Sequence, residues 1–193
     1  MEGIEGLERI AENVYFLYGD VFCSNIYILR NGADVLLIDS GSGSTIPQLD
    51  LALAGYRVDR VILTHGHADH ISGMNYISAD GHLREEDVAI LDELNSFIPG
   101  YKPPNNIDPL EYSKLKFGGF TLRMIHTPGH TPGSISIYEE KDGLLFSGDT
   151  LFAGEEVGRT DLPGGNQEDL ERSVAKLKAL EYDMLCPGHG DIE

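Results

Sequence analysis

The chain has 193 residues, of which 41% are hydrophobic, and it shows no linker or short-period repeat, so we predict a single folded domain over residues 1–193. Its 14 basic and 32 acidic residues give a formal net charge of −18, which disfavours nucleic acids and anionic membranes as partners. The acidic start without an apolar segment, apolar runs too short for a bilayer and only two cysteines predict a soluble, cytoplasmic protein without a disulfide framework.

The first third of the chain has the pattern of a β-meander followed by a helix and a buried strand. Short segments rich in β-branched and aromatic residues are separated by turn residues such as those of the Asn-Gly pair at 31–32. These predicted strands cover residues 14–18, 25–29 and 35–38. A helix is predicted over residues 46–54, because Pro47 suits a first turn and Gly55 suits a helix end. The apolar run at 58–63 predicts a buried strand.

The rest of the chain repeats the order of strands followed by helices. Apolar spacing predicts a helix over residues 84–94, and a long proline-rich loop is expected at 98–109. Further strands are expected at 121–125, 134–138, 144–146 and 184–186. Before the last strand, Asn166 is placed to cap a helix whose apolar stripe covers residues 170–180. Two clusters of strands with helices after each predict two sheets with helices outside.

A dense group of metal-ligand side chains follows the predicted strand at 58–63. Residues 65–70 read His-Gly-His-Ala-Asp-His, so four ligand-type side chains fall within six residues. Neutral imidazole and carboxylate are ligands that a divalent ion such as zinc accepts. We therefore predict a metal site here.

Three later residues stand in similar places, because His130, Asp149 and His189 each come shortly after an apolar strand and a glycine. Strands of a sandwich end at common edges, so we expect these loops to meet on one rim. The predicted metal ligands are His65, His67, Asp69, His70, His130, Asp149 and His189. Seven groups are too many for one tetrahedral zinc and suit two metals that share a bridging carboxylate and hold a hydroxide between them.

The same segments resemble the motifs of the metallo-β-lactamase fold hydrolases, and they occur in that family's order. They are THGHADH at 64–70, TPGHTPGS at 127–134, FSGD at 146–149 and PGHG at 187–190. The resemblance implies an α+β fold, specifically an αββα four-layer sandwich. It also implies two divalent metal ions, with zinc expected and iron or manganese as alternatives.

The resemblance implies a role for each of these residues. It assigns His65, His67 and His130 to the first metal and Asp69, His70 and His189 to the second, with Asp149 bridging them. It makes Asp69 catalytic as well, because this carboxylate orients the hydroxide and carries a proton. Asp39 matches an acidic position behind the site that orients a metal ligand.

The segment GRTD at 158–161 is similar to one shared by the glyoxalase II-like (hydroxyacylglutathione hydrolase-like) thioesterases and the persulfide dioxygenases. Our first hypothesis is therefore a hydrolase of small thioesters. Full-length glyoxalase II-like enzymes continue into a C-terminal helical region that contacts glutathione, whereas this chain ends at Glu193. We accordingly expect a small-molecule substrate without committing to glutathione, and we leave homo-oligomerisation open.

A second hypothesis is an oxidoreductase with a single iron held by His65, His130 and Asp149, as in the persulfide dioxygenases. Val157 stands where we would expect a cysteine in those relatives, which favours the hydrolase. Lactonase and phosphodiesterase activities stay open because this fold hosts them too. A non-catalytic metal-storage role is third, because a structural site does not need to generate hydroxide.

Other chemically notable side chains are expected to have ordinary structural roles. His82 is predicted to be a surface or loop residue instead of a ligand, and Cys186 a small buried hydrophobic residue. His126, which ends a strand just before the His130 loop, is predicted to have a structural role or to support a ligand from behind. Arg159 has two readings that the sequence does not separate, binding of an anionic substrate or pairing with a carboxylate such as Asp161.

The proline-rich loop also has two readings. Tyr101 and Lys102 either line a substrate entrance or are solvated loop residues, and we expect the latter.

Overall fold

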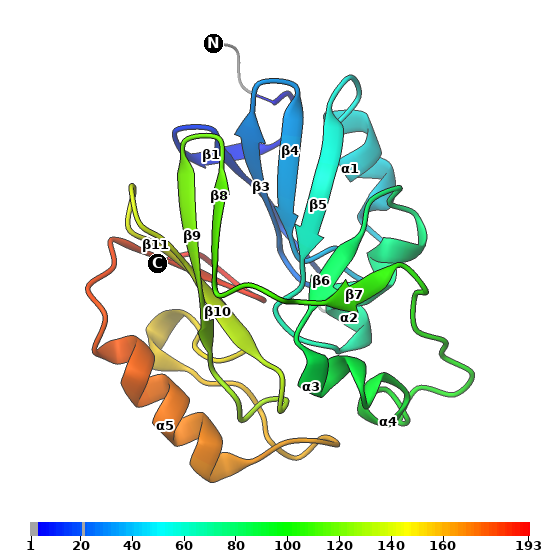
Figure 1. Cartoon of the computed structure of the whole chain (residues 1–193), viewed down its shortest axis with the longest axis vertical. Coiled ribbons are helices and arrows are strands. Elements are labelled where there is room, and N and C mark those ends of the chain that lie inside the picture. The colour runs from blue at the N-terminus through cyan, green and yellow to red at the C-terminus, as the bar shows by residue number, and fades with distance from the viewer. Residues whose placement is uncertain (1–3, 21) are drawn as a thin grey trace.

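The computed structural model describes residues 4–20 and 22–193 and arranges them in two β-sheets packed face to face (Figure 1). In this part of the chain, one sheet has seven strands in the order β1 to β7. The other has five strands in the order β12-β11-β10-β9-β8. Both sheets combine antiparallel and parallel pairs, because β4 to β7 run parallel in the first sheet and β11 and β12 run parallel in the second.

The seven-stranded sheet contains the predicted meander. Its strands are β1 (Glu8–Ala11), β2 (Val14–Leu17), β3 (Ile26–Asn31), β4 (Asp34–Ile38), β5 (Arg57–Ile62), β6 (Gly81–Leu83) and β7 (Ile107–Pro109). The strands predicted at 14–18, 25–29, 35–38 and 58–63 are confirmed within one or two residues. The proline-rich loop is shorter than predicted, since its end pairs as β7 with β6. Pro109 is tolerated there because β7 is an edge strand.

The helical segments of this half confirm the helix predicted at 46–54 within two residues, include two that were not predicted, and contradict the helix predicted at 84–94. They are α1 (Ile46–Ala52), α2 (Ala68–Ile71), η1 (Ser72–Asn75), α3 (Glu85–Val88) and α4 (Leu91–Leu94). The single helix predicted over 84–94 is wrong, because Ile90 leaves helical geometry with φ −129° and ψ 23° and separates α3 from α4. The bend lies between two polar side chains, Asp87 and Asn95, that bind neighbouring loops instead of facing solvent.

The second half of the chain forms the other sheet and the longest helix. Its elements are β8 (Lys114–Phe117), β9 (Phe120–His126), β10 (Ile135–Glu139), β11 (Leu144–Gly148), η2 (Ala153–Glu155), α5 (Gln167–Lys178) and β12 (Met184–Pro187). The predicted cap is confirmed, because Asn166 Oδ1 accepts a hydrogen bond of 3.1 Å from the Asp169 amide. No helix of the described residues is long and apolar enough to span a bilayer.

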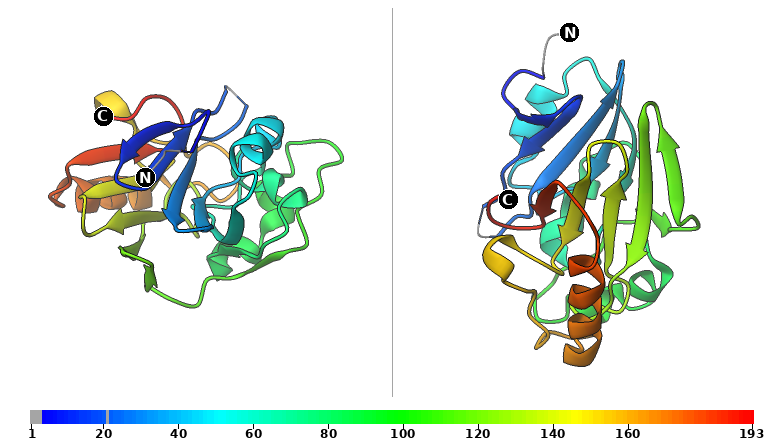
Figure 2. Two further views of the ribbon diagram at one scale, coloured as in Figure 1. Left: turned by 90° about the horizontal axis from the view of Figure 1, so that it is seen from above. Right: turned by 90° about the vertical axis from the view of Figure 1, so that its left-hand side faces the viewer.

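Apolar side chains fill three layers between the elements, which gives the molecule four layers of secondary structure (Figure 2). Alternation along the strands produces this arrangement. In β3, Ile26 and Ile28 pack toward the α1 side, whereas Tyr27 and Leu29 face the opposite sheet. A third cluster packs Leu177 of α5 onto the outer face of the five-stranded sheet. The predicted α+β fold, an αββα sandwich, is confirmed.

Candidate metal centre

The loops that follow β5, β9, β11 and β12 meet at one end of the sandwich. They bring together all seven side chains that the sequence singled out as ligands, namely His65, His67, Asp69, His70, His130, Asp149 and His189. Their ligand atoms form three overlapping groups, and within each group the atoms lie within 4.8 Å of one another. The side chains meet because β5, β9, β11 and β12 all end at this end of the sandwich, and each ligand-bearing loop begins where its strand ends.

The first group contains His65, His67 and His130, all of which are buried. His67 Nδ1 lies 2.9 Å from His130 Nε2, and the rings of His65 and His130 are 4.7 Å apart. Three buried imidazoles around one point can bind a divalent ion in the way that three histidines do in catalytic zinc sites.

The second group contains Asp69, His70 and His189. His189 Nε2 lies 3.0 Å from Asp69 Oδ2 and 3.2 Å from His70 Nε2. Asp69 and His70 come from the first turn of α2, so the backbone of one short helix fixes their relative position. This group therefore has the composition of a second divalent site.

The Asp149 carboxylate lies between the two groups and presents one oxygen to each. Its Oδ1 is 3.3 Å from His70 Nε2, and its Oδ2 is 3.5 Å from His130 Nε2. Gly188 is required beside it, because a Cβ there would come within 2.2 Å of Asp149 Oδ1.

Unpartnered polar atoms in the site fit a bound cation. Among the described residues, the buried atoms without a hydrogen-bond partner include His65 Nε2, His67 Nε2 and Asp149 Oδ1. Burying such atoms without a partner is costly, and coordination by a divalent ion would satisfy imidazole nitrogen and carboxylate oxygen alike. The residues present therefore fit two divalent ions.

Hydrogen bonds behind the site orient three of the imidazole rings. His70 Nδ1 lies 2.8 Å from Asp39 Oδ2, and His130 Nδ1 lies 2.8 Å from the Arg159 carbonyl oxygen. His65 Nδ1 lies 3.1 Å from Thr64 Oγ1. Each contact leaves Nε2 free to face the centre, which is how ligating histidines are held in metal sites. Asp39 has the position that the sequence predicted for it.

The electrostatics favour ligand-competent protonation states at four of the side chains. At His70, burial lowers the pKa but the nearby carboxylates of Asp149 and Asp39 outweigh it and raise the pKa, so that an ion bound there would displace a proton. Burial and the neighbouring histidines lower the pKa of His67 to about 3 and place that of His65 well below its usual range. Burial opposes ionisation of Asp149, but the charge of His70 outweighs it and leaves the pKa of Asp149 well below its ordinary value. The pKa of Asp69 is lowered for the same reason, with His189 also contributing. Two histidines are thus neutral and two aspartates are ionised at neutral pH.

Two further residues, neither of them predicted from the sequence, hold the loop that carries His65 and His67. Asp87 accepts hydrogen bonds from the Gly66 amide (2.8 Å), the Gly133 amide (2.6 Å) and Thr131 Oγ1 (2.7 Å). It therefore ties the His65–His67 loop to the His130 loop. Burial raises the pKa of Asp87, while the three donors oppose that rise.

Asn95 completes this support. Its Oδ1 accepts from the Ala68 amide at 2.8 Å, and its Nδ2 donates to the Gly66 carbonyl at 2.9 Å. A signal for both residues was present in the sequence, because Asp87 and Asn95 have helical spacing with the apolar Leu91 and Leu94. A polar residue on an apolar face indicates a buried hydrogen-bonding role.

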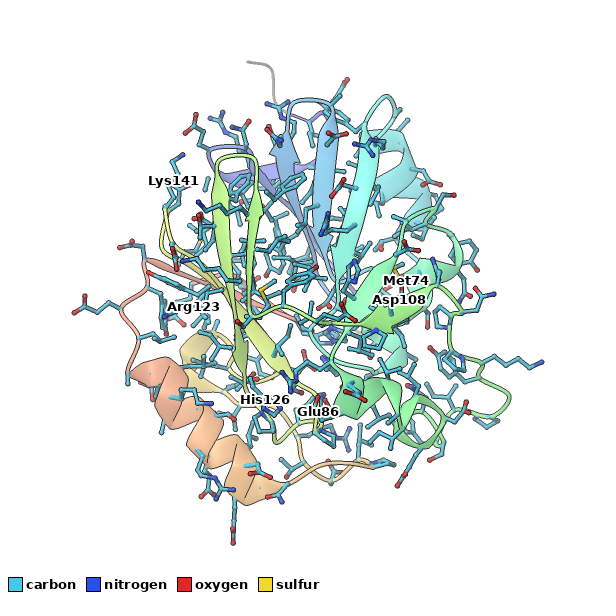
Figure 3. All side chains as sticks on the ribbon, viewed as in Figure 1. Met74, Glu86, Asp108, Arg123, His126 and Lys141 are labelled. Atoms are coloured by element: carbon cyan, nitrogen blue, oxygen red, sulfur yellow. The ribbon has the colours of Figure 1, made fainter. Side chains whose placement is uncertain are left out.

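The remaining predicted roles have mixed outcomes. His82 lies half-buried in the strand β6 instead of in a loop, with its ring 5.8 Å from that of Tyr112, and among the described residues it belongs to none of the candidate ligand groups, in agreement with the prediction that it is not a ligand. His126 is structural as predicted, since its Nε2 lies 2.8 Å from the Pro132 carbonyl at the end of β9 (Figure 3). Cys186 is buried as predicted, and burial raises the pKa of its thiol to about 12.

A cleft of about 1070 Å³ lies over the centre. Its lining includes His67, Asp69, His130, Asp149 and His189.

Two of the three residues that the sequence left with two readings, Tyr101 and Arg159, belong to this cleft. Tyr101 lines it, with its hydroxyl 3.4 Å from Ser72 Oγ, whereas Lys102 is an exposed loop residue. Arg159 lines it too and pairs with both carboxylate oxygens of Asp161 at 2.7 and 2.6 Å. The predicted ion pair is confirmed, and anion binding by Arg159 stays a prediction.

Comparison with known proteins agrees with this centre. Residues 19–189 match the sequence model of the metallo-beta-lactamase superfamily. The chain is 37% identical over 193 residues to a probable metallo-hydrolase of Methanocaldococcus jannaschii, covering 91% of this chain and 92% of that protein. It is 35% identical over 182 residues to a probable metallo-hydrolase of Bacillus subtilis, covering 86% and 85% of the two chains.

A solved structure has the same arrangement of elements. The crystal structure of the protein TTHA1623 in a di-iron-bound form matches with a TM-score of 0.75 at 29% identity, covering 92% of this chain and 93% of that one. The αββα sandwich, the candidate centre on its rim and the match over residues 19–189 lead to one conclusion. This chain belongs to the metallo-beta-lactamase superfamily.

Proposed function

We propose that this protein is a hydrolase that cleaves small acyl thioesters with two divalent metal ions held by the seven residues of the candidate centre. The observation that carries the proposal is the place of Asp149, whose two oxygens face His70 in one group and His130 in the other. Relatives named as metallo-hydrolases support the same class of reaction. The GRTD segment at 158–161 supports the group of thioesterases and persulfide dioxygenases that share it, and Val157 favours the thioesterase within that group.

The side chains of the centre would have separate roles in such a reaction. When bound, two such ions supply Lewis acidity, which polarises an acyl carbonyl and lowers the pKa of water toward neutrality. Asp69 lines the cleft as an ionised carboxylate and accepts the proton of the attacking water. Asp39 and the Arg159 carbonyl hold the His70 and His130 rings in place. A thiolate leaves readily, so the site needs no strong general acid.

The test begins with the metal content of the protein purified without added metal. We expect two divalent ions per chain, zinc by preference, and hydrolysis of S-lactoylglutathione or of a neutral thioester followed by thiol release. The di-iron-bound form of TTHA1623 makes iron the main alternative occupant. Reconstitution with zinc, iron or manganese, one at a time, identifies the ion that supports turnover.

Matched variants separate loss of metal from loss of structure. Asp149→Asn is expected to bind at most one ion and to lose thioesterase activity, because the amide replaces one of the two carboxylate oxygens that face His70 and His130. His82→Ala is the control histidine, since it lies in β6 outside the centre and is expected to keep both ions and activity. One iron per chain together with oxygen uptake on a glutathione persulfide would overturn the proposal in favour of a dioxygenase.

A further inference from the structure

Exposed aromatic side chains gather around the cleft. Phe22 is 81% exposed, Tyr18 is 54% exposed and Phe97 is 49% exposed, and all three line the cleft over the candidate centre. Ile98 and Leu162 extend the same apolar lining. Large apolar side chains that meet in one concavity indicate a binding surface, because isolated exposed residues would be scattered over the molecule.

We call the side chains of Tyr18, Phe22, Phe97, Ile98 and Leu162 the apolar wall of the cleft. Local contacts hold this wall next to the candidate centre. The Phe22 amide donates to Asp20 Oδ1 at 2.7 Å, and the Ser24 amide donates to the Asp69 carbonyl at 3.0 Å. The segment that carries Phe22 is thus fastened to the backbone of a candidate ligand. On the other loop, the Phe97 ring meets the His67 ring edge-on with the centroids 6.3 Å apart. The wall therefore begins directly beside the position where a scissile bond would lie.

Outside the candidate centre, the charges of the cleft are unfavourable for an anionic group. Asp20 lines it as a carboxylate outside the ligand set, whereas the charges of Asp69 and Asp149 would be neutralised by bound ions. Among the described lining residues the cation is Arg159, whose guanidinium already binds both oxygens of Asp161. The whole chain carries a formal net charge of −18. A leaving group whose carboxylates lie beyond the reach of the bound ions would meet this acidic surface, and no unpaired arginine or lysine of the described lining residues would offset the repulsion.

We propose that the cleft takes a thioester with an apolar acyl group, either aryl or medium-chain alkyl, on a thiol without negative charge. This substrate class rests on the proposed hydrolase function. Water adds across the C–S bond, so that its oxygen joins the acyl carbon, the thiolate departs and takes up the proton, and a carboxylic acid and a thiol result. Phe22 and Phe97 contact the acyl chain and set the preference for it.

The experiment uses the full chain loaded with metal and two matched substrate series. N-acetylcysteamine thioesters of acetate, butyrate and hexanoate vary the acyl chain, and kcat/KM should rise by about two- to fourfold per methylene as each becomes buried. Phenylacetate carried on N-acetylcysteamine or on glutathione varies the charge of the thiol. The neutral thioester should be favoured by about tenfold, and this preference should shrink as salt is added.

Variants of the wall test which residues read the acyl group. Phe22→Ala and Phe97→Ala should each flatten the dependence on chain length, because they remove apolar surface from the cleft. Leu51→Ala is the matched control, since Leu51 is 79% exposed on α1 and is not part of the cleft lining. This control should keep the wild-type dependence. Metal content is measured for every variant because Phe97 contacts His67.

The outcomes separate this inference from the proposed function. Equal kcat/KM along the acyl series, or a preference for glutathione thioesters, would overturn the substrate class while leaving a thioesterase. If no thioester is hydrolysed, binding of ketone analogues with a methylene in place of sulfur is measured by calorimetry. Tighter binding of the longer and uncharged ketones would then support the apolar cleft without thioesterase activity, and equal binding would reject it.

Discussion

Asp39 shows how one buried residue outside the centre can control its geometry. It follows β4 with a φ of 61°, a conformation that asparagine and aspartate tolerate better than most residues. In that position its carboxylate accepts from the Thr64 amide at 2.7 Å and from Thr64 Oγ1 at 2.8 Å, and it lies 2.8 Å from His70 Nδ1. Asp39 thus joins the end of β4 to a ring of the second candidate group.

Asp39→Asn is predicted to weaken divalent metal binding by about 10- to 100-fold. Asparagine keeps the backbone conformation, but its amide nitrogen must face one of the donors that the carboxylate now accepts. The orientation of the His70 ring is then lost, and the group of Asp69, His70 and His189 should release its ion first. Competition titration against a coloured chelator measures the affinity of each ion.

The control for this change lies at the other end of the same strand. Asp34 begins β4 and pairs with Arg57 at 2.8 Å near the surface, so Asp34→Asn should leave both affinities at their wild-type values. Wild-type metal affinity in Asp39→Asn would show that Asp39 does not position His70.

The short helices α3 and α4 support the centre through hydrogen bonds from two buried side chains. Asp87 joins the His65–His67 loop to the His130 loop, and Asn95 binds both sides of the same turn through Gly66 and Ala68. Helices of four residues each have little stability of their own. Their place in the fold follows from these buried hydrogen bonds.

Asp87→Asn is predicted to lower the free energy of unfolding by about 2–4 kcal/mol, because a buried amide cannot accept all three hydrogen bonds that the carboxylate accepts. Urea denaturation of the chelated protein measures the loss without any contribution from bound metal.

The neighbouring Glu86 provides a matched comparison on the same helix. Glu86 is half-buried and pairs with Arg84, so Glu86→Gln should change stability by less than about 1 kcal/mol (Figure 3). Equal stability of Asp87→Asn and Glu86→Gln would contradict the role given to Asp87.

Sequence patterns predicted the elements whose residues carry their own signal. Strands such as β3 and β11 consist of apolar and aromatic runs, and α5 has both a cap and an apolar stripe. The strands β6 and β7 were missed because they are three residues long and contain glycine or proline. They exist only because β5 supplies an edge for parallel pairing.

The candidate centre could be predicted further than its surroundings. Ligand-type side chains at fixed spacing can be recognised in the sequence without knowledge of the fold. The fold brings all seven predicted residues together, and metal binding by them stays a prediction. The roles of Asp87 and Asn95 depend on which loops pack beside α3 and α4. The cleft wall was missed for a similar reason, because an aromatic residue such as Phe22 or Phe97 in a loop has no pattern that distinguishes binding from packing.

At the scale of the whole molecule, the centre joins the two sheets. The loop after β5 of the seven-stranded sheet supplies His65 and His67, and the following helix α2 supplies Asp69 and His70. His130, Asp149 and His189 follow strands of the five-stranded sheet. The backbones are joined at the same place, because the Asn25 amide donates to the Gly188 carbonyl at 2.7 Å and the Ile135 amide donates to the Thr64 carbonyl at 2.8 Å. Ions bound here would hold both halves of the sandwich.

Removing one of the two ions is therefore predicted to lower the melting temperature by about 5–10 °C, and removing both by about 10–20 °C. An ion at about 100 times its Kd contributes about 2.7 kcal/mol to the folded state, and a chain of this size melts about 2–4 °C lower for each kcal/mol lost. Circular dichroism with and without chelator measures the shift. Asp149→Asn, which is expected to bind at most one ion, should show no more than about half of the shift, whereas Asp161→Asn, which alters an exposed carboxylate outside the ligand set, should keep the full shift. A wild-type protein that binds metal yet melts equally with chelator would show that these ions do not hold the sheets together.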